Sequence, residues 1–331
     1  MSLVDEEEKQ RSVLAPEFYR KMLAVRLFEQ RAIELYTRGE IRGVIHPYIG
    51  EEAVAVGACA VLNNDDYVVS THRGHGHCIA KGASLDRMMA ELLGRSNGYC
   101  RGKGGSMHLA TFEVGMLGAI GIVAAGIPIA VGAGLSVKLR KTRQVVICFF
   151  GDGAVNQGAF HEGLNMAAVW NLPVVFLCEN NFYAISTHVS RVSAVTEVAR
   201  RSCAYDIPGK RVDGNSVWAV YEAVQEAVAR ARHGHGPSLI EALTYRHEGH
   251  YKGDPGHYRP PEELKKWQRK DPIKKLRKEL LAKNWLEPKA LEELEQEVAQ
   301  DVQRAVEFAR KSPYPAEEEL TSDIFGGDHR K

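Results

Sequence analysis

The 331-residue sequence lacks the features that mark several specialised classes of protein. Its 43 Lys and Arg nearly balance 42 Asp and Glu, which argues against a strongly basic nucleic-acid binder and against a long acidic tail. The six scattered cysteines form no C-x-x-C pair, so we expect reduced thiols. The acidic first residues contain no apolar core of a secretory signal. We therefore predict a cytoplasmic protein with no nucleic-acid or membrane partner.

Long uncharged segments are also scarce, with one exception. Residues 114–137 contain no Asp, Glu, Lys or Arg, a length that is sufficient to cross a bilayer. The segment also holds six glycines and Pro128. Its Gly and Ala content suits close packing inside a soluble α/β protein at least as well as a membrane span.

The length indicates about two domains, or one large α/β domain with an appendage. Apolar periodicity predicts helices at 15–40, 51–62, 85–94, 126–139, 156–170 and 221–234. Strands are expected at 66–70, 144–150, 172–178 and 237–246, and loops at 71–82 and 97–121. From Pro260 onward the sequence is charged and helical. These patterns predict an α/β fold, a mostly parallel sheet with helices on both faces and a helical C-terminal extension.

Polar residues follow the two clearest buried strands. Gly151-Asp152-Gly153 ends the first strand and Asn181 ends the next, and ligands of open α/β sheets bind at such strand ends. Glycines and a helix N-terminus suit a phosphate, which Asp152 would repel unless a divalent cation lay between them. Oxygen ligands suit Mg²⁺, with Asp152 and Asn181 as side-chain ligands and the Tyr183 carbonyl as a third. The competing interpretation is two ordinary turns, in which Gly, Asp and Asn are common.

A histidine-rich segment, THRGHGH, follows the strand at 66–70. The spacing permits a metal cluster of His72, His75, His77 and Cys78, although the hydrolase motif H-E-x-x-H is missing.

The G-D-G at 151–153 with the N-N at 180–181 resembles the thiamine-diphosphate-binding motif. The surrounding sequence resembles the α subunit of the thiamine-dependent first component of 2-oxo-acid and acetoin dehydrogenase complexes. The resemblance runs from HPYIGEEAVAVG (46–57) to SPYPAEEELTSDIF (312–325). It implies a thiamine-diphosphate-binding fold that holds thiamine diphosphate and Mg²⁺. We assign residues 1–45 to an N-terminal helical arm, 46–258 to the cofactor-binding domain and 259–331 to the helical extension.

The resemblance also implies roles for individual residues. The expected cofactor-binding residues are Arg73, Gly121, Ile122, Val123, Gly151, Gly153, Ala154, Asn181, Arg246 and His250. The expected metal ligands are Asp152, Asn181 and Tyr183, and the expected catalytic residues are His46, His75 and His250. A histidine near neutrality suits proton transfer, while the competing interpretation of His46 is a turn residue before Pro47. The sequence departs from the family at Ile120 and at Ala124-Ala125, where relatives often carry Asn and Gly.

By the same resemblance, the enzyme forms a hydroxyethyl adduct on the cofactor from a small-molecule substrate, acetoin or a 2-oxo acid. It then passes the acyl unit to a lipoyl group of a dihydrolipoyl acyltransferase. No motif here supplies the carboxylate that activates the cofactor, which in this family is a Glu of the β subunit, so we expect two α and two β chains. Acetoin and pyruvate stay open as substrates, with branched-chain 2-oxo acids as the alternative. A nicotinamide-dependent oxidoreductase is more remote, because position 156 is Asn and G-x-G-x-x-G is not completed at 151.

Overall fold

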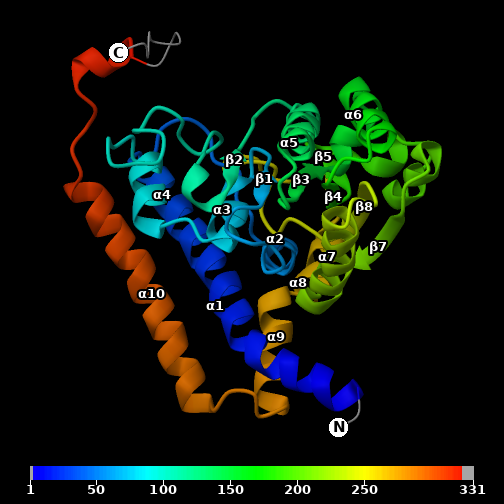
Figure 1. The fold of residues 1–331 in the computed structure, drawn as a ribbon. Coiled ribbons are helices and arrows are strands. Elements are labelled where there is room, and N and C mark those ends of the chain that lie inside the picture. Colours follow the sequence, from blue (N-terminus) through cyan, green and yellow to red (C-terminus); the bar gives the residue numbers. More distant parts are fainter. Residues whose placement is uncertain (1–2, 323–331) are drawn as a thin grey trace.

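The computed structural model describes residues 3–322 and contains a parallel sheet with helices on both faces (Figure 1). The strand order is β2-β1-β3-β4-β8-β7, and every neighbouring pair is parallel. The strands are β1 (Tyr67–Val69), β2 (Met116–Gly118), β3 (Val146–Gly151), β4 (Val174–Asn180), β7 (Gly209–Asp213) and β8 (Ser238–Leu243). The predicted α/β class with a mostly parallel sheet is confirmed.

Helices make up most of the rest of the described chain. They are α1 (Leu3–Thr37), α2 (Glu52–Cys59), α3 (Gly74–Lys81), α4 (Leu85–Leu92), α5 (Gly126–Arg140), α6 (Gly158–Val169), α7 (Val217–Arg232), α8 (Pro261–Gln268), α9 (Pro272–Ala282) and α10 (Pro288–Lys311). The order β3-α6-β4 is the β-α-β unit expected from the sequence, so its two strand ends lie at one edge of the sheet.

Alternate residues of the central strands enter two separate cores. Ile147 and Phe149 of β3 pack with α2 and α7, whereas Val146, Cys148 and Phe150 pack with α5 and α6. Successive side chains of a strand point to opposite faces, so a strand buried on both faces reads as a continuous apolar run. This explains why β3 and β4 were recognisable in the sequence.

The structure corrects the predicted loop at 71–82, because residues 74–81 form helix α3. Its histidines and glycines gave no apolar stripe. They are buried nonetheless. Glu29 and Glu179, from distant segments, lie within hydrogen-bond distance of the His75 and His77 rings. The sequence also failed to indicate the short strand β2, the polar edge strand β7 and a small antiparallel hairpin of β5 (Tyr183–Ala184) and β6 (Thr187–His188).

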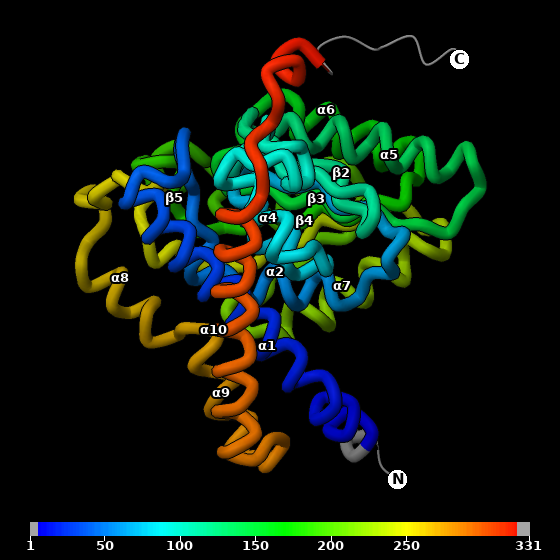
Figure 2. Tube along the Cα trace, turned by 90° about the vertical axis from the view of Figure 1, so that its left-hand side faces the viewer, coloured from blue at the N-terminus to red at the C-terminus, as the bar shows by residue number. Residues whose placement is uncertain are grey.

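The two ends of the described chain pack together. Helix α10 lies against α1 and α4, and α9 lies against α1, as Figure 2 shows from a second side. Buried residues of α1, α9 and α10 belong to the same core cluster as α2, α7 and one face of the sheet. The predicted arm (1–45) and extension (259–331) therefore share one core with the central domain. Residues 1–2 and 323–331 of those two segments lie outside the described residues.

The uncharged segment 114–137 is divided between β2, a turn and the first part of the 15-residue helix α5. Across residues 3–322 we find no helix that is both long and apolar enough to cross a membrane. All six cysteines are free, as expected. Gly134 of α5 explains part of the glycine content, because a Cβ there would lie 2.6 Å from Cγ2 of Val174.

Candidate functional site

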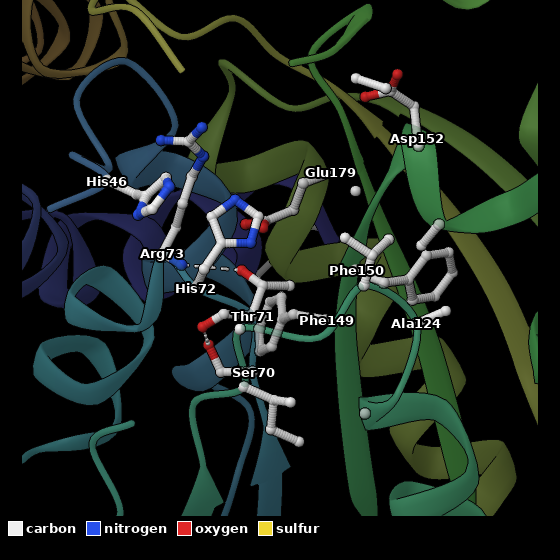
Figure 3. Close-up of a pocket in the computed structure, with 18 of the residues that line it drawn as sticks. His46, Ser70, Thr71, His72, Arg73, Ala124, Phe149, Phe150, Asp152 and Glu179 are labelled. Atoms are coloured by element: carbon white, nitrogen blue, oxygen red, sulfur yellow. Dashed lines mark hydrogen bonds between the residues drawn. The ribbon is translucent and has the colours of Figure 1, made fainter. Parts of the chain in front are cut away.

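A cavity of about 440 Å³ opens at the carboxyl ends of β1, β3 and β4 (Figure 3). Residues at the ends of these strands and just after them line it, within the segments 70–73, 151–154 and 179–185. Of the residues predicted from the sequence, all except His75 line this cavity. They are His46, Arg73, Gly121, Ile122, Val123, Gly151, Asp152, Gly153, Ala154, Asn181, Tyr183, Arg246 and His250.

The expected cation ligands carry unpaired oxygen atoms. Asp152 is only 2% exposed, and neither its Oδ2 atom nor Oδ1 of Asn181 has a hydrogen-bond partner among the described residues. Burial raises the pKa of Asp152 to about 6, although Arg246 opposes the shift. A buried carboxylate without a partner is costly, and a bound divalent cation removes that cost. These residues therefore fit a hard cation such as Mg²⁺.

Tyr183 lines the cavity, and its hydroxyl donates to Oε2 of Glu263, 2.9 Å away. The chain turns sharply just before it, at Phe182, whose φ is +70°. Gly153 is required where β5 passes close by, since a Cβ there would lie 2.7 Å from Cβ of Ala184.

Two buried guanidinium groups converge on His250 from different parts of the chain. Arg73 donates to the His250 carbonyl at 2.7 Å, and Arg246 donates to Nδ1 of the same residue at 3.0 Å. Burial and, after it, the charge of Arg246 lower the pKa of Arg73 to about 10. Two adjacent buried cations are unfavourable without an anion, so this corner fits a phosphate or diphosphate group.

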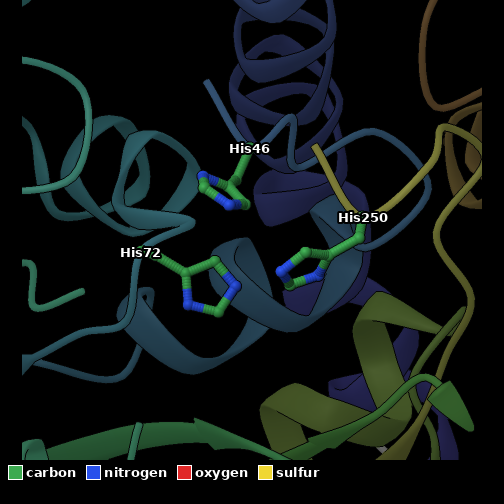
Figure 4. A group of neighbouring side chains, drawn as sticks. All are labelled: His46, His72 and His250. Carbon is green, nitrogen blue, oxygen red and sulfur yellow. The ribbon is translucent and has the colours of Figure 1, made fainter. Parts of the chain in front are cut away.

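Three histidines face one another in the same corner (Figure 4). The His46 ring centroid lies 4.7 Å from that of His72 and 5.0 Å from that of His250. Burial and the neighbouring Arg73 lower the pKa of His46 to about 3 and that of His250 to about 4, and the pKa of His72 is lowered as well. At neutral pH these imidazoles are uncharged, and their lowered pKa makes them weak proton acceptors unless nearby negative charge raises it.

The structure does not support the predicted catalytic role of His75. Its Nδ1 lies 3.0 Å from Oε2 of Glu29, its Nε2 lies 3.0 Å from Oγ of Ser106, and its side chain is 1% exposed. Both ring nitrogens are therefore engaged inside the protein, away from the cavity lining. The physical reason is helix α3, which points successive residues in different directions.

For the same reason the alternative cluster of His72, His75, His77 and Cys78 does not assemble. His72 lines the cavity, while the His77 ring is buried between Oγ of Ser70 (2.7 Å) and Oε1 of Glu179 (3.0 Å). The histidines that do converge, His46, His72 and His250, come from three separate segments.

Sequence reasoning missed two buried carboxyl groups beside the cavity. Glu179, the last residue but one of β4, lines the cavity and accepts hydrogen bonds from the Tyr48 hydroxyl and from His77. Glu51 accepts a hydrogen bond from Nδ2 of Asn181 at 2.9 Å. Burial and the nearby Glu179 raise the pKa of Glu51 to about 7. The only sequence signal was the position of Glu179, an acidic residue directly before Asn180 and Asn181.

The mouth of the cavity is apolar and open to solvent. Ile122 is 74% exposed and Val123 is 51% exposed, and Ile185 on the opposite side is 61% exposed. The loop continues through Ala124, whose φ of +68° lies in the region that favours glycine. Gly is the residue that the family resemblance led us to expect at 124–125.

Comparisons with known proteins agree with this geometry. Residues 19–318 match the family described as "Dehydrogenase E1 component". The chain is 51% identical to the alpha subunit of acetoin:2,6-dichlorophenolindophenol oxidoreductase of Bacillus subtilis, over 93% of this chain and 92% of that relative. It is 46% identical to the protein of the same name in Cupriavidus necator, over 93% and 92% of the two chains. It is 43% identical to the pyruvate dehydrogenase E1 component subunit alpha of Rhizobium meliloti, over 92% and 88%. Because the matched region includes the whole cavity and every strand that builds it, the chain belongs to the dehydrogenase E1 component family.

Proposed function

We propose that this chain is the α subunit of a thiamine-diphosphate- and Mg²⁺-dependent dehydrogenase whose best substrate is acetoin. Membership of the E1 family implies thiamine diphosphate as the cofactor. The observation that carries the proposal is the juxtaposition of two kinds of buried group. Unpaired oxygens of Asp152 and Asn181 suit a divalent cation, and the guanidinium groups of Arg73 and Arg246 suit the diphosphate.

Each residue then has a stated role. Asp152, Asn181 and the Tyr183 carbonyl would hold Mg²⁺. Arg73 and Arg246, which contact His250 here, would hold the diphosphate. When bound, thiamine diphosphate supplies the carbanion that attacks the substrate carbonyl.

The chain's histidines handle protons at the reacting end. His46 and His250 are neutral near pH 7. The negative charge of a bound diphosphate would raise their pKa, so that each could accept a proton or relay one through its second ring nitrogen. Nδ1 of His46 is buried without a partner among the described residues, which leaves it available to a substrate oxygen. Ile122 and Val123 limit the access of water to the cavity mouth when a partner covers them.

The site requires a second subunit. Among the described residues, the carboxyl groups that line the cavity are those of Asp152 and Glu179. That of Asp152 is assigned to the cation, and that of Glu179 accepts hydrogen bonds from Tyr48 and His77. Neither is left to activate the cofactor, so we assign that role to a Glu of a β subunit in an assembly of two α and two β chains. The relatives' names, which include "subunit alpha", support a partner, and the exposed apolar rim offers a surface for it. A lipoyl group of a partner acyltransferase would receive the acyl unit.

The choice of acetoin depends on charge and on the relatives. Among residues 3–322 no Lys lines the cavity, and both arginines that line it are assigned to the diphosphate, so this part of the chain offers no further cation for a substrate carboxylate. Acetoin is uncharged. The two relatives above with the higher identities carry acetoin in their names, which favours it; pyruvate remains the second candidate because of the 43% identical Rhizobium protein. None of these relatives is named for a branched-chain substrate.

Calorimetric titration tests cofactor binding. We expect thiamine diphosphate with Mg²⁺ to bind the chain together with its β partner, and we expect Asp152→Ala to abolish the Mg²⁺-dependent binding because the carboxylate ligand is lost. Asp65→Ala, at an exposed position outside the cavity, is the matched control. Absence of binding by the wild-type chain, with and without the partner, would contradict the proposal.

A substrate panel tests the specificity. With 2,6-dichlorophenolindophenol as the electron acceptor, the reconstituted α/β enzyme should show the highest kcat/KM for acetoin, with release of acetaldehyde. Pyruvate and branched-chain 2-oxo acids complete the panel. A higher kcat/KM for pyruvate would replace acetoin by the second candidate, and full activity of the α chain alone would refute the shared site.

A further inference from the structure

Glu51 is a buried carboxyl group that the proposed reaction does not use. Its side chain is fully buried, and it stands at the N-cap position of α2. Carboxylates at this position often stabilise their own helix by accepting hydrogen bonds from its first N–H groups. Here the side chain makes no such bond, so capping does not explain why a carboxyl group is buried at this point.

The side chain instead contacts a proposed cation ligand. Nδ2 of Asn181 donates to Oε1 of Glu51 at 2.9 Å, in a buried contact between residues 130 positions apart. The other end of the same amide, Oδ1 of Asn181, is buried and has no partner among the described residues. Oδ2 of Asp152 is unpaired in the same way.

The two ends of an asparagine amide are nearly identical in shape but opposite in hydrogen-bonding character. The Oε1 atom of Glu51 that faces Asn181 accepts the hydrogen bond, so beside it the NH₂ end is favoured and the oxygen is left at the opposite side. A cation needs that oxygen and is repelled by the NH₂ end. The charge of Glu51 is partly balanced by Arg73, whose Nε lies 3.9 Å from Oε2.

We propose that Glu51 is a positioning residue, which fixes the Asn181 side-chain amide with its oxygen toward the cation site beside Asp152. This inference rests on the proposed function, because it presupposes a divalent cation bound by Asp152 and Asn181. It assigns to Glu51 an effect on metal affinity that acts only through Asn181.

A double-mutant cycle with Mn²⁺ as the probe tests the assignment. Mn²⁺ is titrated into the chain with its partner subunit and thiamine diphosphate, and free Mn²⁺ is measured from its electron paramagnetic resonance signal. Loss of a group that orients a metal ligand typically weakens metal binding by about 10- to 100-fold, and we expect a weakening of this size for Glu51→Ala. In an Asn181→Ala background the same change should have no further effect, since the amide it orients is gone.

An exchange variant provides the rescue. In Glu51→Gln with Asn181→Asp, the amide and the carboxylate change places, so Gln at 51 donates to one Asp oxygen and the other oxygen faces the cation. The total charge of the pair is unchanged. We expect this variant to bind Mn²⁺ more tightly than Glu51→Ala. Glu51→Gln alone should bind Mn²⁺ more weakly than the wild-type chain, because the Gln amide can present either its oxygen or its NH₂ group to Asn181.

Several outcomes would overturn the inference. Unchanged Mn²⁺ affinity in Glu51→Ala, or an equal loss in the wild-type and Asn181→Ala backgrounds, would mean that Glu51 does not act through Asn181. Thermal unfolding of each variant and of the wild-type chain, without metal, shows whether a loss of Mn²⁺ affinity reflects only a loss of stability. If Asp152→Ala also binds Mn²⁺ normally, the proposed cation site is wrong as well; if Asp152→Ala alone abolishes binding, only the role of Glu51 fails.

Discussion

At the scale of single residues, the cavity holds groups whose charge depends on their surroundings. His46 and His250 are neutral because burial and two guanidinium groups oppose their protonation. Arg73 and Arg246 each donate a hydrogen bond to His250, and no acidic side chain among the described residues forms an ion pair with them except the more distant Glu51 carboxyl group. The site is therefore prepared for negative charge, which the diphosphate would bring.

These histidines predict a loss of stability in acid. Their pKa values in the folded chain, about 3 for His46 and about 4 for His250, lie below the ordinary value of 6.5. Between pH 6.5 and 4 the unfolded chain binds more protons at these two positions, so their contribution to the free energy of unfolding should fall as the pH falls through this window. The raised pKa values of Asp152 and Glu51 contribute in the opposite direction, so the effect of the histidines is read from the difference between wild type and variant. Urea unfolding of the chain without cofactor, between pH 7.5 and 4.5, measures the slope.

His250→Gln should reduce that slope, because the amide does not titrate, whatever its effect on stability at pH 7. His257→Gln, exposed in the same loop, controls for the removal of a histidine. An unchanged slope in His250→Gln would contradict the interpretation of this residue as a buried neutral imidazole.

Single residues also show the limits of sequence reasoning. Asp152 and Asn181 were predictable, because the carboxyl ends of adjacent parallel strands meet at one edge. His75 was misplaced because its segment is a helix and not a loop. Glu51 and Glu179 carried no pattern, since their partners lie more than 100 positions away along the chain.

At the scale of elements, helix α5 shows two uses of glycine. Gly134 faces the sheet, where a Cβ would meet the buried Val174 at 2.6 Å. Gly132 faces outward with no atom within 4 Å of such a Cβ. Ile129 and Leu139, 46% and 73% exposed, lie on the outer side of the same helix.

The two glycines predict opposite effects of the same substitution. Gly134→Ala should destabilise the isolated chain by about 1–3 kcal/mol through overpacking. Gly132→Ala should stabilise it by about 1 kcal/mol, because alanine loses less backbone entropy in a helix. Chemical denaturation of both variants checks this, and equal effects would contradict the assigned faces. If the outer side of α5 contacts the partner subunit, Gly132→Ala should also weaken assembly.

At the scale of the whole molecule, a buried ion-pair group joins the two ends of the chain to the centre. Nε of Arg26 in α1 lies 2.6 Å from Oε1 of Glu52 in α2, and Nη1 of Arg26 lies 3.0 Å from Oδ2 of Asp271. Asp271 also caps α9. Together with the shared core, this makes the helical arm, the sheet and the extension one cooperative unit.

Arg26→Met should destabilise the protein by about 3–5 kcal/mol, because it leaves two buried carboxyl groups without their cation. Arg20→Met, which removes a more exposed pair between α1 and Glu297 of α10, should cost less than about 1 kcal/mol. Urea unfolding followed by tryptophan fluorescence measures both. Two separate transitions, or a small effect of Arg26→Met, would show that the ends fold independently of the centre.

The sequence by itself determined the α/β class, the β-α-β unit and the residues at its strand ends, because these depend on local periodicity and on the geometry of parallel strands. Only the tertiary structure decided which buried polar groups meet. It placed His46, His72 and His250 together, turned His75 and His77 inward, and set Glu51 against Asn181. Such contacts join segments far apart in the chain, and a buried polar residue's neighbours are fixed by packing and not by the residues next to it in sequence.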